Sequence, residues 1–342
     1  MVAPLSSGAM PRPHAAADRA ADGLPHSVAR VAVVGSLNMD VVLTLARVPQ
    51  VGETVHAQGL RYVPGGKGGN QAVACARHGA QVQLFGSVGR DHHGNALRLA
   101  LHGDGVDVEH VEVHEGLPTG SAVILVEPDG QNRICVVPGA NARLTLPEDA
   151  LLHALVQADF LLLQLEVPDA VIEQVLQAAH SAGCRVVLNP SPVRTLPSAW
   201  WPMVHTLVVN EVEAAAFSGL NVDSQQSAER AARALLAHGP QQVVVTLGAQ
   251  GAVALCAAGS HQAAPVCSRH AARQVQVVDT TGAGDSFLGA MVTRLAEGCT
   301  LAEAVEWGIA AASLCIGVAG AQPSIPARAQ VEALVQPATK LE

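Results

Sequence analysis

Residues 279–285, Asp-Thr-Thr-Gly-Ala-Gly-Asp, combine a glycine-rich turn with a carboxylate at the start of a predicted helix over 288–297. Backbone N–H groups at a helix start lack partners and the helix dipole is positive there, so such a turn binds anions. A carboxylate in an anion site costs electrostatic energy. That cost makes sense if the carboxylate takes a proton from a nucleophile that attacks the bound anion. The loop therefore predicts phosphoryl transfer with Asp285 as the base. A simple helix cap at Asp285 is the alternative.

A second glycine-rich turn, Gly-Gly-Lys-Gly-Gly-Asn at 65–70, leads into another predicted helix. Four glycines in five positions let a ligand approach the backbone closely. Lys67 is one of only two lysines in the chain, and Asn70 offers a donor and an acceptor at the helix start. This turn predicts a contact to a polyol or sugar, whereas a flexible turn is the alternative.

Polar residues also follow two apolar runs that are typical of buried strands. Asn38 and Asp40 come after the run 31–34, and Glu166 comes directly after the run 160–165. Carboxylates accept hydrogen bonds from sugar hydroxyls, while a lysine and an asparagine donate them, so these residues extend the predicted sugar site. An Asx turn at Asn38 and Asp40 is the alternative.

Two further strand ends suggest a nucleotide. Asn210 and Glu213 follow the strand 206–209 and lie three residues apart, on one face of a helix start. They predict a water-mediated anchor for Mg²⁺ and phosphate, because Mg²⁺ keeps several waters and few protein ligands. An N-cap with a first-turn acid is the alternative. Residues 246–251, Thr-Leu-Gly-Ala-Gln-Gly, end another strand and could lie along a nucleotide.

Composition excludes several other classes of protein. The net charge of −9 without a basic run argues against nucleic acid or an anionic membrane as a partner. Seven cysteines without a CxxC pair suggest reduced thiols in a cytoplasm, and the fifteen scattered histidines do not form a zinc pattern. The chain contains neither the P-loop pattern GxxxxGK[ST] nor a GxGxxG fingerprint of a nicotinamide site.

Strands and helices alternate through most of the chain, which predicts an α/β fold with a doubly wound, mostly parallel sheet. Such sheets bind ligands beyond the carboxyl ends of their strands, where the glycine turns fall. The predicted strands are 31–34, 82–88, 106–113, 160–165, 185–188, 206–209 and 242–247. The predicted helices include 91–102, 168–182, 211–217, 227–238 and 301–318. Four other segments, 41–45, 54–63, 121–126 and 133–137, are expected to form one small separate sheet.

The same motifs occur, in the same order, in the PfkB carbohydrate kinase family, and the chain resembles its ribokinase-like members over residues 30–335. The Asp-Thr-Thr-Gly-Ala-Gly-Asp loop is specific for the family, while the Asn-x-Asp and Gly-Gly-Lys-Gly-Gly-Asn-Gln motifs narrow the resemblance to ribokinase-like members. The other matching motifs are Pro-Gly-Ala-Asn at 138–141, Gln-Leu-Glu at 164–166, Asn-Glu-Val-Glu at 210–213, Thr-Leu-Gly at 246–248 and Gly-Ala-Gln-Pro-Ser at 320–324.

The resemblance implies a ribokinase-like fold with a small β-sheet lid, built from strands within about 39–64 and 119–138, that also forms a homodimer interface. Residues 1–29 are expected to be a disordered tail and 336–342 a C-terminal tail. The implied reaction is ATP-dependent phosphorylation of D-ribose at the 5-hydroxyl, with Mg²⁺ and an activating K⁺. Kinases of deoxyribose, of another pentose or of a nucleoside are alternatives, and a non-catalytic sugar sensor is an alternative of another class.

The resemblance also implies a role for individual residues. Asp285 would be the base, and the amides of Gly282, Ala283 and Gly284 would hold the transferred phosphoryl group. Ribose would contact Asn38, Asp40, Gly66, Lys67, Asn70, Glu166 and Asp285. ATP would contact Asn210, Thr246, Leu247, Gly248, Ala249, Gln250, Gly251, Gly284 and Ile309, the last in place of a residue that is often polar in relatives. Glu213 would hold Mg²⁺ through water, and K⁺ would lie among Asp279, Thr281, Cys315, Val318, Gly320 and Ser324.

Overall fold

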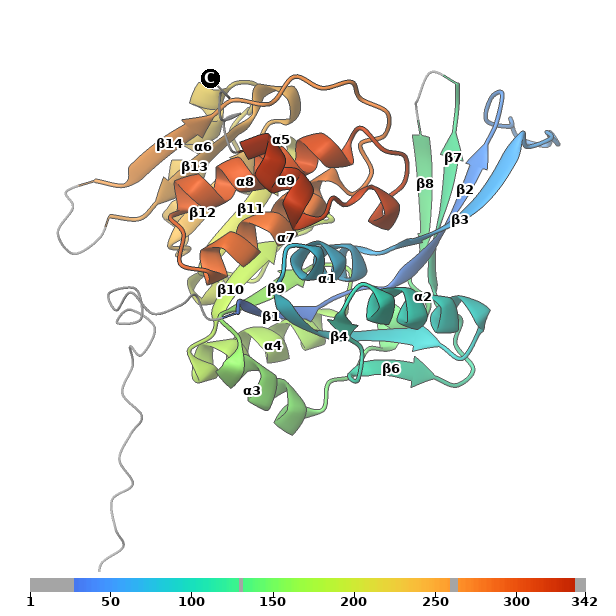
Figure 1. Cartoon of the computed structure of the whole chain (residues 1–342), viewed down its shortest axis with the longest axis horizontal. Helices are drawn as coiled ribbons and strands as arrows, with labels where there is room; N and C mark the ends of the chain where they lie inside the picture. Colours follow the sequence, from blue (N-terminus) through green and yellow to red (C-terminus); the bar gives the residue numbers. More distant parts are fainter. Residues whose placement is uncertain (1–27, 129–131, 259–263, 336–342) are drawn as a thin grey trace, which may run out of the picture.

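The computed structural model of this protein describes residues 28–128, 132–258 and 264–335 (Figure 1). Most of the two predicted tails, residues 1–27 and 336–342, lies outside the described residues. Ala29, the last residue of the predicted N-terminal tail, is buried, and its carbonyl accepts a hydrogen bond from the backbone N–H of Gln81 at 2.8 Å. The packed fold therefore includes Ala29.

The core of the molecule is a ten-stranded sheet in the order β14-β13-β12-β11-β10-β9-β1-β4-β5, with β6 paired to β4. All neighbours from β12 to β5 run parallel, and β13 and β14 add an antiparallel edge. The strands are β1 Arg30–Val34, β4 Gln81–Gly89, β5 Val106–Asp107, β6 Val111–His114, β9 Phe160–Gln164, β10 Arg185–Asn189, β11 Thr206–Asn210, β12 Gln242–Thr246, β13 Ala252–Cys256 and β14 Val266–His270. The predicted doubly wound, mostly parallel sheet is confirmed.

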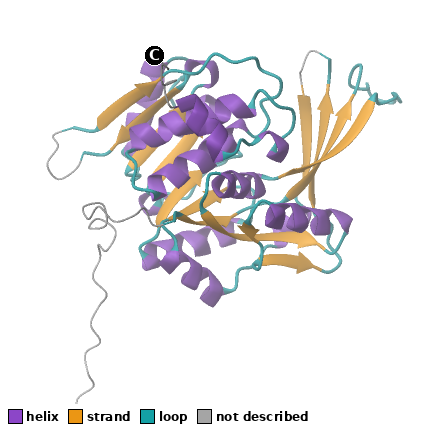
Figure 2. Cartoon of the chain, in the orientation of Figure 1, coloured by secondary structure: helices purple, strands orange, loops and turns teal. Residues whose placement is uncertain are grey.

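Helices cover both faces of this sheet (Figures 1 and 2). Val31 and Val33 of β1 pack on the face covered by α1, α2, α7 and α8, whereas Ala32 and Val34 pack on the face covered by α3 to α6. Both faces are thus buried, which explains the continuous apolar runs of the strands. The helices are α1 Lys67–Arg77, α2 His92–Gly103, α3 Glu148–Gln157, α4 Asp169–Ala182, α5 Glu211–Ser218, α6 Gln225–Leu236, α7 Ala283–Ala296, α8 Leu301–Cys315 and α9 Arg328–Val335.

A second sheet of four strands stands to one side of the main body (Figure 2). It consists of β3 Gly59–Gly65, β2 Asn38–Thr44, β7 Gly120–Val126 and β8 Asn132–Val137, in that order. β2 pairs with β3 antiparallel and with β7 parallel, so Asn38 lies opposite both Gly65 and Gly120. The expected small sheet is therefore confirmed, and we call these four strands the small sheet.

Some predicted boundaries were wrong. The predicted strand 106–113 is split into β5 and β6, because a turn forms between them in which Asp107 accepts from the backbone N–H of Glu109. β2 begins at Asn38, so Asn38 and Asp40 lie in a strand and not in a turn. α7 begins at Ala283, five residues earlier than predicted. α3 and α9 were not predicted. Among the described residues, no helix is both long and apolar enough to cross a membrane.

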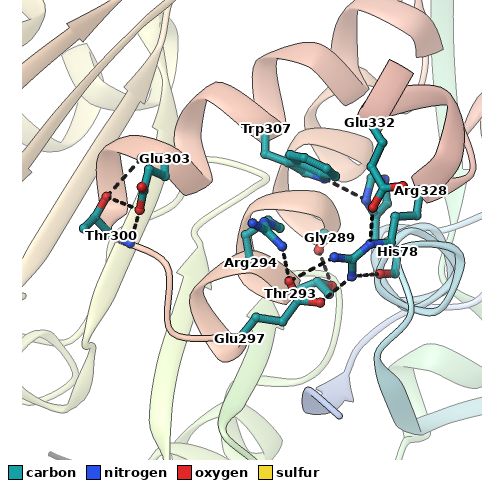
Figure 3. Close-up of polar contacts among 10 residues, drawn as sticks. All are labelled: His78, Gly289, Thr293, Arg294, Glu297, Thr300, Glu303, Trp307, Arg328 and Glu332. Atoms are coloured by element: carbon teal, nitrogen blue, oxygen red, sulfur yellow. Dashed lines mark hydrogen bonds and ion pairs between the residues drawn. The ribbon is translucent and has the colours of Figure 1, made fainter. Parts of the chain in front are cut away.

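A cluster of polar side chains joins the C-terminal ends of α1 and α7 to α8 and α9 (Figure 3). The Trp307 indole N–H donates to His78 Nδ1 at 3.0 Å, and Arg328 donates to the backbone carbonyl of His78 at 3.2 Å. Arg328 also pairs with Glu297. This His78 cluster fixes α1 against α7, and the opposite ends of these two helices carry the site described below.

Candidate active site

After β1 the chain adds β4 and β5 on one side of β1, and from β9 onward it adds strands on the other side. The boundary between β1 and β9 is therefore the switch point in strand order, which is where parallel sheets bind ligands. Ser36 follows β1 and Glu166 follows β9, and the Ser36 hydroxyl donates to Glu166 Oε2 at 2.5 Å. The same oxygen accepts from the backbone N–H of Lys67 at 3.1 Å, at the start of α1. The glutamate is thus held at the switch point by a loop and a helix N-terminus.

Asp285 lies in the first turn of α7 and is 7% exposed. Its Oδ2 accepts from Asn70 Nδ2 and its Oδ1 accepts from Gln71 Nε2, each at 2.9 Å. The starts of α1 and α7 therefore meet at this carboxylate, and the predicted base and the predicted sugar-binding asparagine are in direct contact.

Two glycines shape the start of α7. Gly282 has φ +78°, which glycine adopts without strain, and this residue caps the helix. At Gly284 an added Cβ would find no atom within 4 Å, so the backbone there faces open space. The first turn of α7 can therefore present its amides to a ligand, as the predicted anion site requires.

Charged groups gather beside Asp285. Burial and, to a smaller extent, the negative charges of Glu166 and Asp285 together raise the pKa of Asp40 to about 7. Burial alone would lower the pKa of Lys67, but Asp285, Glu166 and Glu213 outweigh it, so the pKa of Lys67 is raised. Lys67 is thus a cation among carboxylates, which suits a ligand with several hydroxyl groups.

Asn38 is held by Asn141, which donates from Nδ2 to Asn38 Oδ1 at 2.8 Å. Asn141 also exchanges two hydrogen bonds with the backbone of Leu37, at 2.9 and 3.0 Å. Gly66 has φ +85°, and a Cβ there would lie 2.8 Å from the backbone of Ser36 and of Asn38. The glycine turn therefore packs directly against the strand that carries Asn38 and Asp40.

The predicted nucleotide residues lie along the next strands of the sheet. Asn210 and Glu213 form a capping box on α5, with bonds of 2.8 and 3.0 Å, so the capping alternative describes their geometry correctly. Glu213 is only 5% exposed, and it contributes to the charge around Lys67. One carboxylate oxygen caps the helix, and the other remains for a water molecule, so the residue fits a water-held Mg²⁺.

Thr246 ends β12 directly beside Asn210 of β11. A short 3-10 helix, Gly248–Gln250, follows Leu247 and is exposed, and Gly251 has φ +88°. Ala249 thus lies at the open rim of the site. Ile309, by contrast, is 8% exposed and packs in the core with α7, so it offers little surface to a base.

The residues of the predicted K⁺ site lie in the loop before α7 and in the segment that runs from the end of α8 to a short 3-10 helix, Gln322–Ser324. Asp279 accepts from the backbone N–H groups of Thr281 at 2.9 Å and Gly320 at 2.8 Å. Burial would raise the pKa of Asp279, but these hydrogen bonds outweigh it and keep the pKa lowered. The Cys315 thiol lies 3.0 Å from the Ser324 hydroxyl, while Val318 is 48% exposed. The negative charge of Asp279 fits a monovalent cation.

Four site residues were given no role from the sequence: Ser36, Gln71, Asn141 and Gln164. Gln71 and Gln164 are completely buried, and Gln164 Nε2 donates to Gln71 Oε1 at 2.6 Å. The available signal was that Gln71, Asn141 and Gln164 lie within the matching motifs at 65–71, 138–141 and 164–166. Their importance depends on contacts between distant segments, which a local pattern does not reveal.

The comparisons with known proteins agree with this geometry. The model of the pfkB family of carbohydrate kinases matches residues 28–328, and the chain belongs to this family. The chain is 37% identical over 297 residues to the ribokinase of Haemophilus influenzae, covering 86% of this chain and 95% of that protein. It is 37% identical over 302 residues to the ribokinase of Staphylococcus aureus, covering 87% and 96%.

Solved structures give the same result. The structure of Arabidopsis thaliana ribokinase complexed with ribose and ATP matches with a TM-score of 0.83 and 34% identity, covering 91% of this chain and all of that one. The ribokinase of Thermotoga maritima matches with a TM-score of 0.77 and 34% identity, covering 90% and 99%. Within the carbohydrate kinase family, these relatives are all ribokinases.

Proposed function

We propose that this protein is a ribokinase, which transfers the γ-phosphoryl group of ATP to the 5-hydroxyl of D-ribose and yields ribose 5-phosphate and ADP. The observation that carries the proposal is the meeting of the starts of α1 and α7 at Asp285. At this point the anion-binding turn of α7 and the base, Asp285, face the residues of α1 that would bind hydroxyl groups. The relatives at 34–37% identity support ribose as the sugar.

In this reaction Asp285 takes the proton of the ribose 5-hydroxyl as the oxygen attacks the γ-phosphorus, and the bond to the ADP oxygen breaks. The amides of Gly282, Ala283 and Gly284 donate to the phosphoryl oxygens, which carry the developing charge. Asn38, Asp40, Gly66, Lys67, Asn70 and Glu166 hold the sugar hydroxyls. Most of the catalysis therefore comes from positioning and charge stabilisation.

The nucleotide and the cations occupy the remaining residues. ATP would lie along Asn210, the stretch Thr246–Gly251 and Gly284, with the buried Ile309 near its adenine. Mg²⁺ bound with ATP would neutralise phosphate charge, and Glu213 would hold one of its waters. Asp279, Thr281, Cys315, Val318, Gly320 and Ser324 would hold K⁺. Support for both cations comes from the uncommitted Glu213 oxygen and from the anionic Asp279.

The small sheet acts as a lid over the sugar and as the interface of a homodimer. Asp40, one of the proposed sugar-binding residues, lies on this sheet. Closure of the small sheet over the sugar would therefore bring Asp40 to the sugar and would exclude water from the phosphoryl group. Five large apolar side chains of the sheet are at least half exposed. Leu60, Tyr62 and Val137 lie on one face of the sheet, and Ile134 and Val136 lie on the other. These exposed side chains support an interface. The free thiols among the described residues are consistent with a cytoplasmic location.

The proposal is tested by ADP release, measured with a coupled assay over a panel of ribose, deoxyribose, other pentoses and nucleosides. Ribose is expected to give the highest kcat/KM, with a product phosphorylated at the 5-position. Turnover with another substrate but not with ribose would contradict ribose as the acceptor. Ribose binding without ADP release would support the sugar sensor.

A further inference from the structure

Two glutamines lie in a chain behind the base. Gln164 Nε2 donates to Gln71 Oε1 at 2.6 Å, and Gln71 Nε2 donates to Asp285 Oδ1 at 2.9 Å. Both glutamines are 0% exposed, and Gln164 Oε1 is buried without a partner among the described residues. A buried amide oxygen without a hydrogen bond destabilises the folded state. A core position that tolerates this cost is a candidate for a functional role.

The charge of Asp285 fixes the direction of the whole chain. An ionised carboxylate only accepts hydrogen bonds, so Gln71 has to turn its NH₂ group toward Asp285. Its carbonyl oxygen then faces Gln164, which in turn has to present its own NH₂ group. The orientation of each amide is therefore determined by the carboxylate and not by the two glutamines alone.

The two oxygens of Asp285 are held in different ways. Oδ2 is bonded to Asn70, which lies at the sugar side and whose own Oδ1 is buried without a partner, so a ligand can replace this contact. Oδ1 is bonded to Gln71, which is buried between α1, β9 and α7 and is itself anchored by Gln164. The Gln71 contact therefore does not involve a residue that the proposed function assigns to the sugar.

We propose that Gln71 is a positioning residue for the base and that Gln164 acts through Gln71 by locking its amide. The contact holds the carboxylate in one rotamer, so that Oδ2 stays directed to the sugar side. Close packing keeps the lock in place, because a Cβ at Gly35 would lie 2.1 Å from Gln164 Oε1. This inference rests on the proposed function, since it assumes that Asp285 is the base.

The test uses Gln71→Met, Gln164→Met and the double variant, because methionine has a similar length but donates no hydrogen bond. We expect Gln71→Met to lower kcat by about 10- to 100-fold, with the KM for ribose changed by less than about threefold. Gln164→Met is expected to lower kcat by about 3- to 10-fold. The double variant should be no slower than Gln71→Met, because Gln164 acts through Gln71.

Calorimetric titration with ribose separates positioning from a loss of folded protein. A positioning defect lowers kcat while the variant still binds ribose with the stoichiometry of the wild type. A loss of folded protein would lower that stoichiometry together with kcat. Thr293→Val is the matched control, because Thr293 is also buried in α7 but its hydroxyl bonds to Gly289 of its own helix and contacts the Cys75 thiol of α1, not Asp285. It should leave both kcat and ribose binding unchanged.

Each outcome decides the inference. With an active wild type, three results would overturn it and leave the proposed function intact: Gln71→Met within twofold of the wild-type kcat, a ribose-binding stoichiometry that falls together with kcat, or losses that multiply in the double variant. A wild type without ribose-dependent ADP release would overturn both. If Gln71→Met does not fold by circular dichroism, Gln164→Met carries the test through its own kcat and ribose-binding stoichiometry, with the same expected and contrary results.

Discussion

At the scale of single residues, the sugar side of the site holds like charges close together. Asp40, Glu166 and Asp285 are near enough to raise the pKa of Asp40, and Lys67 is the cation among them. Without a bound sugar, Asp40 is therefore about half protonated near pH 7. Hydroxyl groups that donate to a carboxylate stabilise its charged form, so sugar binding and proton binding are linked at this residue.

Ribose binding at pH 7 is expected to release about half a proton, because hydroxyl donors lower the raised pKa of Asp40. Calorimetric titrations in buffers of different ionisation enthalpy measure the release. Asp40→Asn should abolish it at saturating ribose, whereas Glu53→Gln, an exposed site on the loop after β2, should not. A binding enthalpy of the wild type that does not depend on the buffer would contradict this linkage.

The sequence predicted those residues that lie at strand ends or in glycine turns, since parallel strands bring such positions together. Asp285 and Asn70 meet as expected for that reason. Ser36, Gln71, Asn141 and Gln164 were not predicted, because their partners lie far along the chain. Gln164 and Gln71, for example, are separated by 93 residues. A buried glutamine in a helix cannot be told from an exposed one without the partner that covers it.

At the scale of elements, the start of α5 combines a helix cap with the proposed Mg²⁺ contact. We expect Glu213→Gln to leave thermal stability nearly unchanged, because glutamine can still accept from the backbone N–H of Asn210. The Mg²⁺ concentration for half-maximal activity should rise several-fold, because the neutral side chain holds a metal-bound water less well.

The matched control is Glu303→Gln, since Glu303 occupies the same position in the capping box of α8. It should change neither stability nor Mg²⁺ dependence. Equal Mg²⁺ dependence of Glu213→Gln and the wild type would restrict Glu213 to the structural role.

The His78 cluster links stability to pH. Burial and the nearby Arg328 lower the pKa of His78 from 6.5 to about 4. The unfolded chain therefore binds the proton first as the pH falls, and stability present above about 6.5 is lost progressively toward pH 4. By pH 5 this residue alone lowers the free energy of unfolding by about 2 kcal/mol.

We expect His78→Asn to flatten this dependence, because its Oδ1 can still accept from the Trp307 indole but does not titrate. Urea unfolding at pH 7 and pH 5 measures the effect. His205, whose pKa burial also lowers to about 4, keeps its contribution in both proteins, so the difference between variant and wild type isolates His78. An unchanged difference between the two pH values would contradict the assignment.

The elements that were predicted well are the ones whose surroundings impose a simple pattern. β1 and β9 to β12 are buried on both faces and are continuous apolar runs. The break between β5 and β6 was missed because it depends on one side-chain bond, from Asp107 to the backbone of Glu109. The early start of α7 was missed because a glycine turn also reads as a loop.

At the scale of the whole molecule, the small sheet would serve two purposes, covering the sugar and joining two copies. We expect the double variant Leu60→Asp/Tyr62→Asp to shift the sedimentation coefficient from dimer to monomer, because charges replace exposed apolar side chains. Val156→Asp, at an exposed apolar position of α3 in the main body, should remain dimeric. A wild type that sediments as a monomer would contradict the proposed interface.

The central claim is that Asp285 is the base of a ribose kinase. The most direct measurement compares ribose-dependent ADP release by Asp285→Asn and the wild type, with ribose affinity determined by calorimetry. Asparagine retains the size of the side chain but cannot take the proton, so we expect turnover to fall by about 10²–10⁴-fold while ribose affinity stays within about threefold. Near-normal turnover in the variant would contradict the assignment of Asp285 as the base.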